Sequence, residues 1–260
     1  MELNKIYNED CLTTMSNIQD NYVDLTVTSP PYEKLRKYNG FSFDFEKTAQ
    51  QLFRITSVGG VVVWIVNDMT INGSETGSSF KQALYFMSLG FNLYDTMIYK
   101  KLGTVVQNPV IRYSQDFEYI FVLSKETPKS LNIRRGEATG KIINKTKRHR
   151  HLENIMVRGR YRQGTAPFSN VFEYAVGANS TNDLIAFKHP AIFPDKLAAD
   201  MIYSFSNAGD IVYDPFTGSG TVFKQSFLQK RNFIGSEISS EYVDIANKRM
   251  QPYLNQTTLL

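Results

Sequence analysis

The stretch Asp214-Pro-Phe-Thr-Gly-Ser-Gly-Thr221 decides the fold of this chain. It follows the apolar run 211–213 and precedes residues 222–229, whose apolar spacing predicts a helix. In open α/β sheets, ligands bind where such strand-to-helix turns leave the carboxyl ends of the strands. Gly218 and Gly220 would let the backbone approach a ligand closely. The turn therefore predicts a ligand site in an α/β sheet.

The acid at the end of the next predicted strand indicates the kind of ligand. Residues 232–236 form that strand, and Glu237 follows it. An acid about 20 residues beyond a glycine-rich turn commonly binds ribose hydroxyls. The chain lacks the G-x-G-x-x-G and G-x-x-x-x-G-K-[ST] motifs of dinucleotide and P-loop sites. Asp214 would repel a diphosphate, and an acceptor-rich pocket suits a ligand with an amino group and sugar hydroxyls. S-adenosylmethionine fits, with these candidate binding residues: Asp214, Pro215, Phe216, Thr217, Gly218, Ser219, Gly220, Thr221 and Glu237.

Strand and helix patterns alternate through most of the chain, which predicts an α/β fold with a doubly wound, mostly parallel sheet. The composition of residues 72–79 predicts a flexible loop. The remaining predicted strands are residues 22–28, 60–66, 91–99, 117–123 and 210–213, and the remaining predicted helices are residues 45–55, 80–89, 195–205 and 242–253.

A second motif, Thr28-Ser-Pro-Pro-Tyr32, directly follows the predicted strand 22–28. Two prolines stiffen the loop and remove backbone donors, so that carbonyl oxygens are presented. A hydroxyl and a carbonyl aimed at one point can accept both hydrogens of an amino group, and a tyrosine ring can stack on a base for about 1–3 kcal/mol. A proline-braced turn with an exposed aromatic is the structural alternative. The chemical interpretation makes Ser29, Pro30, Pro31 and Tyr32 the candidate catalytic residues.

Positive charge concentrates in one segment. Residues 125–162 contain twelve Lys and Arg against three Glu, a surplus of nine, whereas the whole chain has a net charge of +4. A solvated lysine-rich loop is the alternative, but the many arginines favour a surface that contacts a nucleic acid. The candidate contacts are Arg134, Arg135, Lys147, Arg148, Arg150, Arg158, Arg160 and Arg162.

Composition excludes several classes of protein. A chain that is 42% hydrophobic and 21% charged is typical of globular proteins rather than disordered ones. Its one cysteine, Cys11, cannot form an intrachain disulfide, which favours a reducing cytoplasm. No apolar run approaches the ~20 residues that span a bilayer, and the N-terminus does not resemble a signal peptide. We therefore expect a cytoplasmic protein with no membrane partner, and no metal site, because no zinc-ligand set can be assembled.

The two motifs in this order, T-S-P-P-Y before D-P-F-T-G-S-G-T, resemble the beta class of DNA amino-methyltransferases. The resemblance covers most of the chain and implies an S-adenosylmethionine-dependent methyltransferase fold with permuted motif order. It implies one methyltransferase domain in two parts, a catalytic part at residues 1–124 and a cofactor part at residues 181–260. The basic segment, within residues 125–180, would be the target-recognition region that reads bases.

The same resemblance assigns further cofactor residues. Asn8-Glu-Asp-Cys11 is similar to the family's N-terminal acidic motif, which implies that Asp10 and Cys11 lie near the adenine. His189-Pro-Ala-Ile-Phe-Pro194 and the helix after it resemble the motif near the methionine end, which implies roles for Phe193 and Lys196. Ile238 would line the site beside Glu237.

The predicted function is methyl transfer from S-adenosylmethionine to an exocyclic amino nitrogen of a base flipped out of double-stranded DNA. Within the family, Ser at the position of Ser29 favours N4 of cytosine, and N6 of adenine is the alternative. A non-enzymatic DNA-binding protein is a more remote alternative. A homodimer and a cognate restriction nuclease are left open as partners, and so is a bacterial or viral origin within a bacterial host.

Overall fold

In the computed structural model, the chain forms two compact units. The larger unit comprises Met1–Asn132 and Asn170–Leu260, and the smaller one comprises Ile133–Ser169. The smaller unit contains an antiparallel pair, β8 (Arg135–Glu137) with β9 (Thr165–Pro167). The structure describes residues 1–31, 43–103, 113–137, 165–177, 180, 181, 183, 185, 186 and 193–257.

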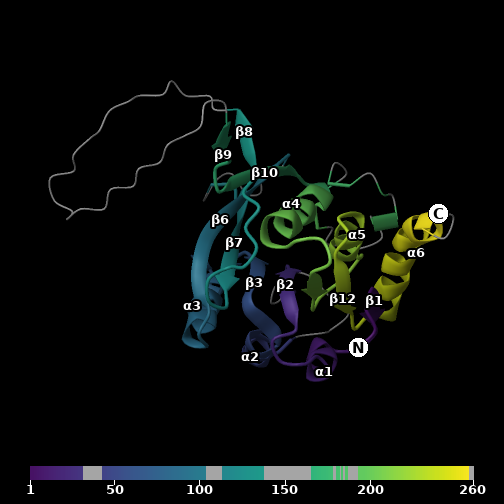
Figure 1. Ribbon diagram of the computed structural model, residues 1–260. Helices are drawn as coiled ribbons and strands as arrows, with labels where there is room; N and C mark the ends of the chain where they lie inside the picture. The colour runs from purple at the N-terminus through teal and green to yellow at the C-terminus, as the bar shows by residue number, and fades with distance from the viewer. Residues whose placement is uncertain are drawn as a thin grey trace. The chain divides into compact units, whose positions relative to one another are not determined.

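The larger unit is built on an eight-stranded sheet with the strand order β1-β12-β11-β2-β3-β7-β6-β10 (Figure 1). Strand β7 runs antiparallel to both of its neighbours, β3 and β6, whereas the other neighbouring pairs are parallel. The expectation of a mostly parallel α/β sheet is therefore confirmed. The strands are β1 (Lys5–Tyr7), β2 (Val23–Thr28), β3 (Thr56–Val66), β6 (Asn92–Leu102), β7 (Phe117–Ser124), β10 (Val171–Ala175), β11 (Ile211–Asp214) and β12 (Asn232–Ser236).

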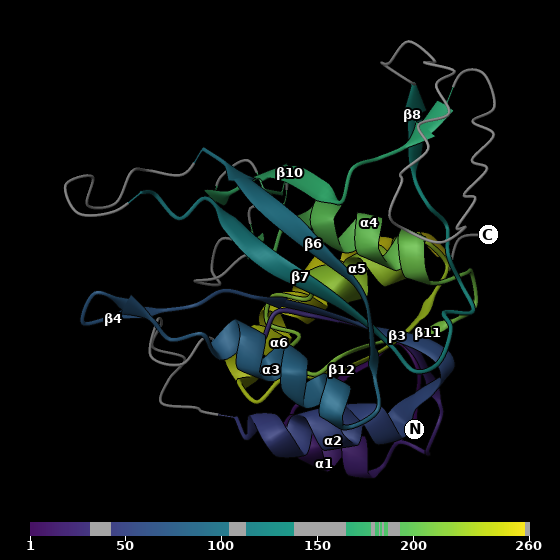
Figure 2. The same cartoon turned by 90° about the vertical axis from the view of Figure 1, so that its left-hand side faces the viewer.

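Within the described residues, helices cover both faces of this sheet (Figure 2). On one face, α1, α2 and α3 pack their apolar residues against alternate side chains of the strands. On the other face, α4, α5 and α6 do the same. Strand β3 is covered on both sides, which explains its continuous run of β-branched residues. The helices are α1 (Cys11–Ser16), α2 (Phe45–Ile55), α3 (Ser78–Ser88), α4 (Asp195–Phe205), α5 (Thr221–Leu228) and α6 (Ser240–Thr257).

The sequence expectation for residues 72–79 was wrong. The segment takes part in a hairpin of β4 (Thr70–Ile71) and β5 (Ser74–Glu75), and α3 begins at Ser78. Asn72 and Gly73 both have positive φ, at 50° and 81°, which suits the tight turn of a two-residue hairpin. The polar composition therefore marks a hairpin turn and a helix start.

Besides the two short hairpins β4–β5 and β8–β9, the short elements β1, α1 and β10 were not predicted. Strands β1 and β10 have three and five residues, and each lies at an edge of the sheet. Helix α1 has only six residues. Such lengths give too few periods for an apolar pattern to be recognised. Within the described part of the chain, no helix combines the length and the apolar character that crossing a membrane requires.

The topology brings the functional motifs together. Strands β1, β12, β11, β2 and β3 all run parallel, so their carboxyl ends share one edge of the sheet. The segments that leave this edge are residues 8–10, 29–31, 67–68, 215–220 and 237–239. A crevice at this edge is the usual ligand site of such folds.

Candidate active site

The two sequence motifs lie on neighbouring strands. In the pairing of β2 with β11, Leu25 faces Val212 and Thr26 faces Tyr213. At the ends of these strands the Thr28 hydroxyl donates a 2.7 Å hydrogen bond to Asp214 Oδ1. The Ser29 loop and the glycine-rich turn (residues 214–221) therefore leave the sheet side by side. Both motifs open at the edge where β2 and β11 end.

Asp214 acts first as a link between the two motifs. Its Oδ1 also accepts a 3.0 Å hydrogen bond from the Phe216 backbone nitrogen, and the residue is only 4% exposed. Burial raises the pKa of this carboxyl to about 7, with the charge of Glu237 adding to the rise, and the two hydrogen bonds oppose it. The side chain thus ties the two loops together, and a direct contact with a ligand remains a prediction.

Glu237 holds the glycine-rich turn from the next strand. Its Oε2 accepts a 2.8 Å bond from the Gly218 nitrogen, and its Oε1 accepts a 2.9 Å bond from the Ser239 nitrogen. Burial raises the pKa of Glu237, although these backbone bonds favour the charged form. Each carboxylate oxygen can accept a further hydrogen bond. The arrangement suits a pair of ribose hydroxyls.

The turn is also held from behind by Arg249 of α6, a residue that the sequence analysis missed. The Arg249 side chain is fully buried. Its Nη1 donates to the Ser219 carbonyl at 2.6 Å, and to the hydroxyls of Ser219 and Thr221 at 3.1 Å each. A buried arginine at this place fixes the backbone of the turn where α5 begins. No sequence signal distinguishes Arg249 from Lys248, the neighbouring basic residue of α6.

Two carboxylates balance the charge of Arg249. Its Nε lies 2.7 Å from Asp183 Oδ2, and its Nη2 lies 3.4 Å from Asp195 Oδ1. Asp195 also binds Lys224 Nζ at 2.9 Å and accepts a 2.9 Å bond from the Thr181 hydroxyl. Buried cations of this kind are stable only when paired and hydrogen-bonded, as they are here. The network joins α4, α5 and α6 behind the glycine-rich turn.

The turn itself has the tight geometry that its glycines permit. Gly220 has φ 80° and precedes α5, and a Cβ at this position would lie 2.7 Å from the Cβ of Ala246 in α6. Phe216 is half-buried, with its ring centroid 4.9 Å from that of Phe43. Pro215 and Thr217 are buried. The glycine at 220 is therefore required both by the backbone and by the close approach of α6.

The N-terminal motif reaches the same edge. The Asn8 side chain donates to the carbonyl oxygens of Glu237 and Ile238 at 2.8 and 3.2 Å. Asp10 caps α1 by accepting a 2.8 Å bond from the Leu12 nitrogen. Asp10 is half-buried and Ile238 is 41% exposed. Asn8 thus contacts the segment that follows β12, and roles for Asp10, Cys11 and Ile238 near the adenine remain predictions.

Cys11 is a packing residue. The thiol is buried beside the Thr48 hydroxyl, and burial, with the Asp10 charge adding to it, raises the thiol pKa to about 12. A thiol with such a pKa carries almost no thiolate at neutral pH. The side chain therefore cannot serve as a nucleophile.

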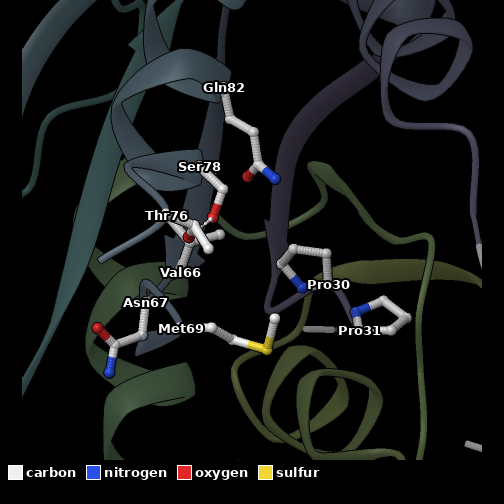
Figure 3. Close-up of a pocket in the computed structure, with 8 residues that line it drawn as sticks. All are labelled: Pro30, Pro31, Val66, Asn67, Met69, Thr76, Ser78 and Gln82. Carbon is white, nitrogen blue, oxygen red and sulfur yellow. Dashed lines mark hydrogen bonds between the residues drawn. The ribbon is translucent and has the colours of Figure 1, made fainter. Parts of the chain in front are cut away.

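The Ser29 loop borders a pocket in the larger unit (Figure 3). Pro30 and Pro31 form one side, and the side chains of Met69 and Gln82 point toward them from the opposite side. The other lining residues are Val66, Asn67, Thr76 and Ser78. We call this the Pro30 pocket. Ser29 is half-buried at its border, and Tyr32, the predicted stacking residue, lies outside the described residues.

Asp68 organises the wall of the Pro30 pocket and was not found from the sequence. Its Oδ1 accepts from the Thr76 and Ser78 hydroxyls at 3.1 and 3.0 Å and from the Ser79 nitrogen at 3.1 Å, and its Oδ2 accepts from the Ser79 hydroxyl. Burial alone would raise the pKa of Asp68, but these hydrogen bonds outweigh it and hold the pKa below its usual value. One carboxylate thus ties the end of β3 to the hairpin and to the start of α3.

The sequence of this chain is similar to those of known proteins. A family model described as DNA methylase, of the N6/N4 methyltransferases, matches residues 23–248. The orphan methyltransferase M.BamHII of Bacillus amyloliquefaciens is 52% identical over 246 residues, which cover 92% of this chain and 92% of that protein. This chain belongs to the N6/N4 DNA methylase family.

Solved structures agree with the fold of this methyltransferase. The PvuII DNA methyltransferase, described as cytosine-N4-specific, superposes with a TM-score of 0.70 at 18% identity, covering 94% of this chain and 84% of that one. M1.HpyAVI in complex with S-adenosylmethionine superposes with a TM-score of 0.60 at 22% identity, covering 94% and 98%. At these identities the likeness establishes a shared architecture.

The predicted residues near the methionine end are only partly brought together. Phe193 packs against the core on the α4 side of the sheet, whereas Lys196 is exposed in the first turn of α4. The buried lysine of this region is Lys224, which binds Asp195. Roles for Phe193 and Lys196 in the methyltransferase remain predictions.

The predicted DNA contacts fall in and around the smaller unit. Arg134 is half-buried before β8, and Arg135 is exposed at its start. The other six candidates, Lys147, Arg148, Arg150, Arg158, Arg160 and Arg162, lie outside the described residues. A recognition role for this segment of the methyltransferase remains a prediction, as do its boundaries at residues 125 and 180.

Proposed function

We propose that this DNA methyltransferase transfers a methyl group to N4 of cytosine after the base has been flipped out of double-stranded DNA. The observation that carries the proposal is the Thr28–Asp214 hydrogen bond, 2.7 Å long, which holds the Ser29 loop beside the glycine-rich turn. A methyl donor on one loop and an amino group on the other would then share one edge of the sheet. An amino nitrogen inside the base stack cannot reach such an edge, so the base must be extruded.

S-adenosylmethionine is the cofactor of this chemistry, and when bound it supplies a methyl group on a positively charged sulfur. The donor set fits it. Glu237 offers acceptors for ribose hydroxyls beside Gly218, and Phe216 offers a ring face for the adenine. Asp10 would lie near the adenine, two residues after Asn8, whose side chain donates to the Glu237 carbonyl.

The Ser29 loop would orient the target amine. The Ser29 hydroxyl and the Pro30 carbonyl would each accept a hydrogen bond from one N–H of the amine. This directs the nitrogen lone pair toward the methyl carbon. The new C–N bond forms as the C–S bond breaks, and the nitrogen then releases one proton to solvent. Positioning supplies the rate enhancement, since no strong base is needed. Serine at position 29 favours cytosine over adenine within the family.

The proposal is tested by methyl transfer from isotope-labelled S-adenosylmethionine into duplex DNA, followed by mass spectrometry of the nucleosides. We expect labelled N4-methylcytosine. Labelled N6-methyladenine would overturn the choice of base while leaving the amino-methyltransferase assignment intact. Absence of label from DNA would overturn the proposal itself.

Ser29→Ala tests the role of the loop. We expect transfer to fall by at least 10-fold with the cofactor dissociation constant unchanged, because the hydroxyl orients only the target amine. Ser16→Ala, which alters an exposed serine on α1, is the matched control. Transfer by Ser29→Ala equal to that of the wild type would remove the serine from the mechanism.

A further inference from the structure

Gln82, on α3, lines the Pro30 pocket. Figure 3 shows its amide pointing from the helix toward Pro30. The residue is half-buried, so its amide remains accessible from the pocket.

The orientation of this amide is fixed by Trp64. The indole nitrogen of tryptophan is only a donor, so its partner must be an oxygen. Trp64 Nε1 donates a 2.8 Å hydrogen bond to Gln82 Oε1. Trp64 is completely buried in β3, where it pairs in register with Thr28, the residue before Ser29. The Gln82 amino group must therefore face away from the indole.

The hydroxyls of the pocket wall and the Asn67 amide oxygen are already bound. The Thr76 and Ser78 hydroxyls donate to Asp68. Asn67 Oδ1 accepts bonds from the Asp68 nitrogen and from Gln115 Nε2. Within the described ranges, by contrast, the Gln82 amino group makes no hydrogen bond. The Asn67 amino group also makes no hydrogen bond among these residues, but its amide points away from Pro30 (Figure 3). Gln82 is thus the oriented donor on the Pro30 side, beside the apolar surfaces of the prolines, Val66 and Met69, an arrangement typical of specific ligand sites.

We propose that Gln82 donates a hydrogen bond to the ring nitrogen next to the amino group of the flipped base. This inference rests on the proposed function. The acceptor is N3 in cytosine and N1 in adenine, each freed when the base leaves its partner. Thymine and guanine carry a hydrogen on the corresponding nitrogen, so a fixed donor would repel them. Gln82 would therefore select amino bases over keto bases.

The test combines Gln82→Glu with a base analogue. The glutamate keeps an acceptor for Trp64 and removes the donor. The substrate is a duplex that the wild type methylates, with the target as cytosine or as 3-deazacytosine, which has C–H in place of N3. We expect Gln82→Glu to lower kcat/KM on the cytosine duplex about 10-fold, the worth of one hydrogen bond. Replacing cytosine by 3-deazacytosine should lower kcat/KM by a factor about 10-fold larger for the wild type than for Gln82→Glu. The substitution and the analogue remove the same hydrogen bond, so the second change has little left to remove.

Two controls separate this role from a structural one. Gln50→Glu makes the same chemical change at an exposed position on α2 and should behave as the wild type on both duplexes. Gln82→Met also loses the bond to Trp64, so it should lower stability where Gln82→Glu does not. If 3-deazacytosine lowers kcat/KM by the same factor in the wild type and in Gln82→Glu, the inference is wrong and Gln82 is only a hydrogen-bond partner of Trp64. If the wild type methylates no DNA at all, the proposed function fails first.

Discussion

The glycine-rich turn and the wall of the Pro30 pocket lie at the same edge of the sheet, yet they are held in different ways. The turn is fixed by residues distant in sequence, since Glu237 and Arg249 reach it from β12 and α6. The pocket wall is fixed locally, because Asp68 binds residues only eight to eleven positions away. The cofactor side is therefore part of the global fold, whereas the target side is a local unit attached to it.

This difference has a consequence for mutations. Damage to the anchors of the turn should lower the stability of the whole protein together with cofactor binding. Damage to the anchor of the pocket wall should affect DNA methylation more than cofactor binding. Four substitutions test the comparison, in order of decreasing expected effect.

Arg249→Met should have the largest effect. It leaves Asp183 and Asp195 without their shared partner, and loss of one member of a buried ion network costs about 3–5 kcal/mol. Urea denaturation should show this loss, and calorimetry should show weaker binding of S-adenosylmethionine. Lys248→Met, on the exposed side of the same helix, is the control. Wild-type stability in Arg249→Met would mean that the turn does not depend on α6.

Asp68→Ala should come next, at about 2–3 kcal/mol, because Asp68 accepts a hydrogen bond from the Ser79 nitrogen in the first turn of α3, whose N-cap residue Gly77 provides no side-chain cap. Steady-state kinetics should show a fall in kcat/KM for DNA, and cofactor affinity should stay within twofold of the wild type. Asp116→Ala, in the loop before β7, changes an acid outside this cap. A parallel loss of cofactor affinity in Asp68→Ala would contradict the separation of the two regions.

Asp214→Asn should change how stability depends on pH. In the folded state, burial raises the pKa of Asp214 to about 7, above its unfolded value, so the neutral acid is favoured. The stabilisation that comes from the neutral Asp214 carboxyl is complete at low pH and is lost as pH rises through about 7. Between pH 5 and 8 the wild type should lose on the order of 2 kcal/mol relative to Asp214→Asn, measured by urea denaturation at both pH values. Asp244→Asn, an exposed change on α6, is the control and should show the same pH dependence of stability as the wild type. The same pH dependence in Asp214→Asn and the wild type would mean that Asp214 is already ionised at pH 5.

Thr28→Val should have the smallest effect, about 1 kcal/mol, since it removes one hydrogen bond between the two motifs. Thermal unfolding would measure it. Thr26→Val is a matched control on the same strand, because Thr26 Oγ1 is buried and has no partner among the described residues. Thr26→Val should leave the stability unchanged or raise it. If it lowers the stability as much as Thr28→Val does, the effect of Thr28→Val does not come from the Thr28–Asp214 hydrogen bond.

Much of this arrangement was predictable from sequence, because the motifs are local. The turn at residues 214–221, the loop at residues 28–31 and the acid at Glu237 each follow a strand that its apolar run identifies. Parallel strands place their carboxyl ends together, so the shared edge followed from the fold class.

The anchors behind the site could not be predicted. Arg249 and Asp68 act through partners that only the folded chain brings within hydrogen-bonding distance. The hairpin at residues 70–75 was missed because the same polar residues suit a loop, a hairpin turn and a helix start. The resemblance implies a role for Lys196 near the methionine end; Lys196 is exposed on α4, and its role stays a prediction, while the buried cations Lys224 and Arg249 had no signal in the sequence.

The most direct measurement is a crystal structure of the enzyme with S-adenosylhomocysteine and a duplex that it methylates. We predict that the cofactor product lies against the glycine-rich turn and Glu237, with its sulfur facing Pro30. The flipped base should occupy the Pro30 pocket, with its ring nitrogen toward Gln82. A cofactor product bound away from the edge shared by β2 and β11, or a target base outside the Pro30 pocket, would contradict the account.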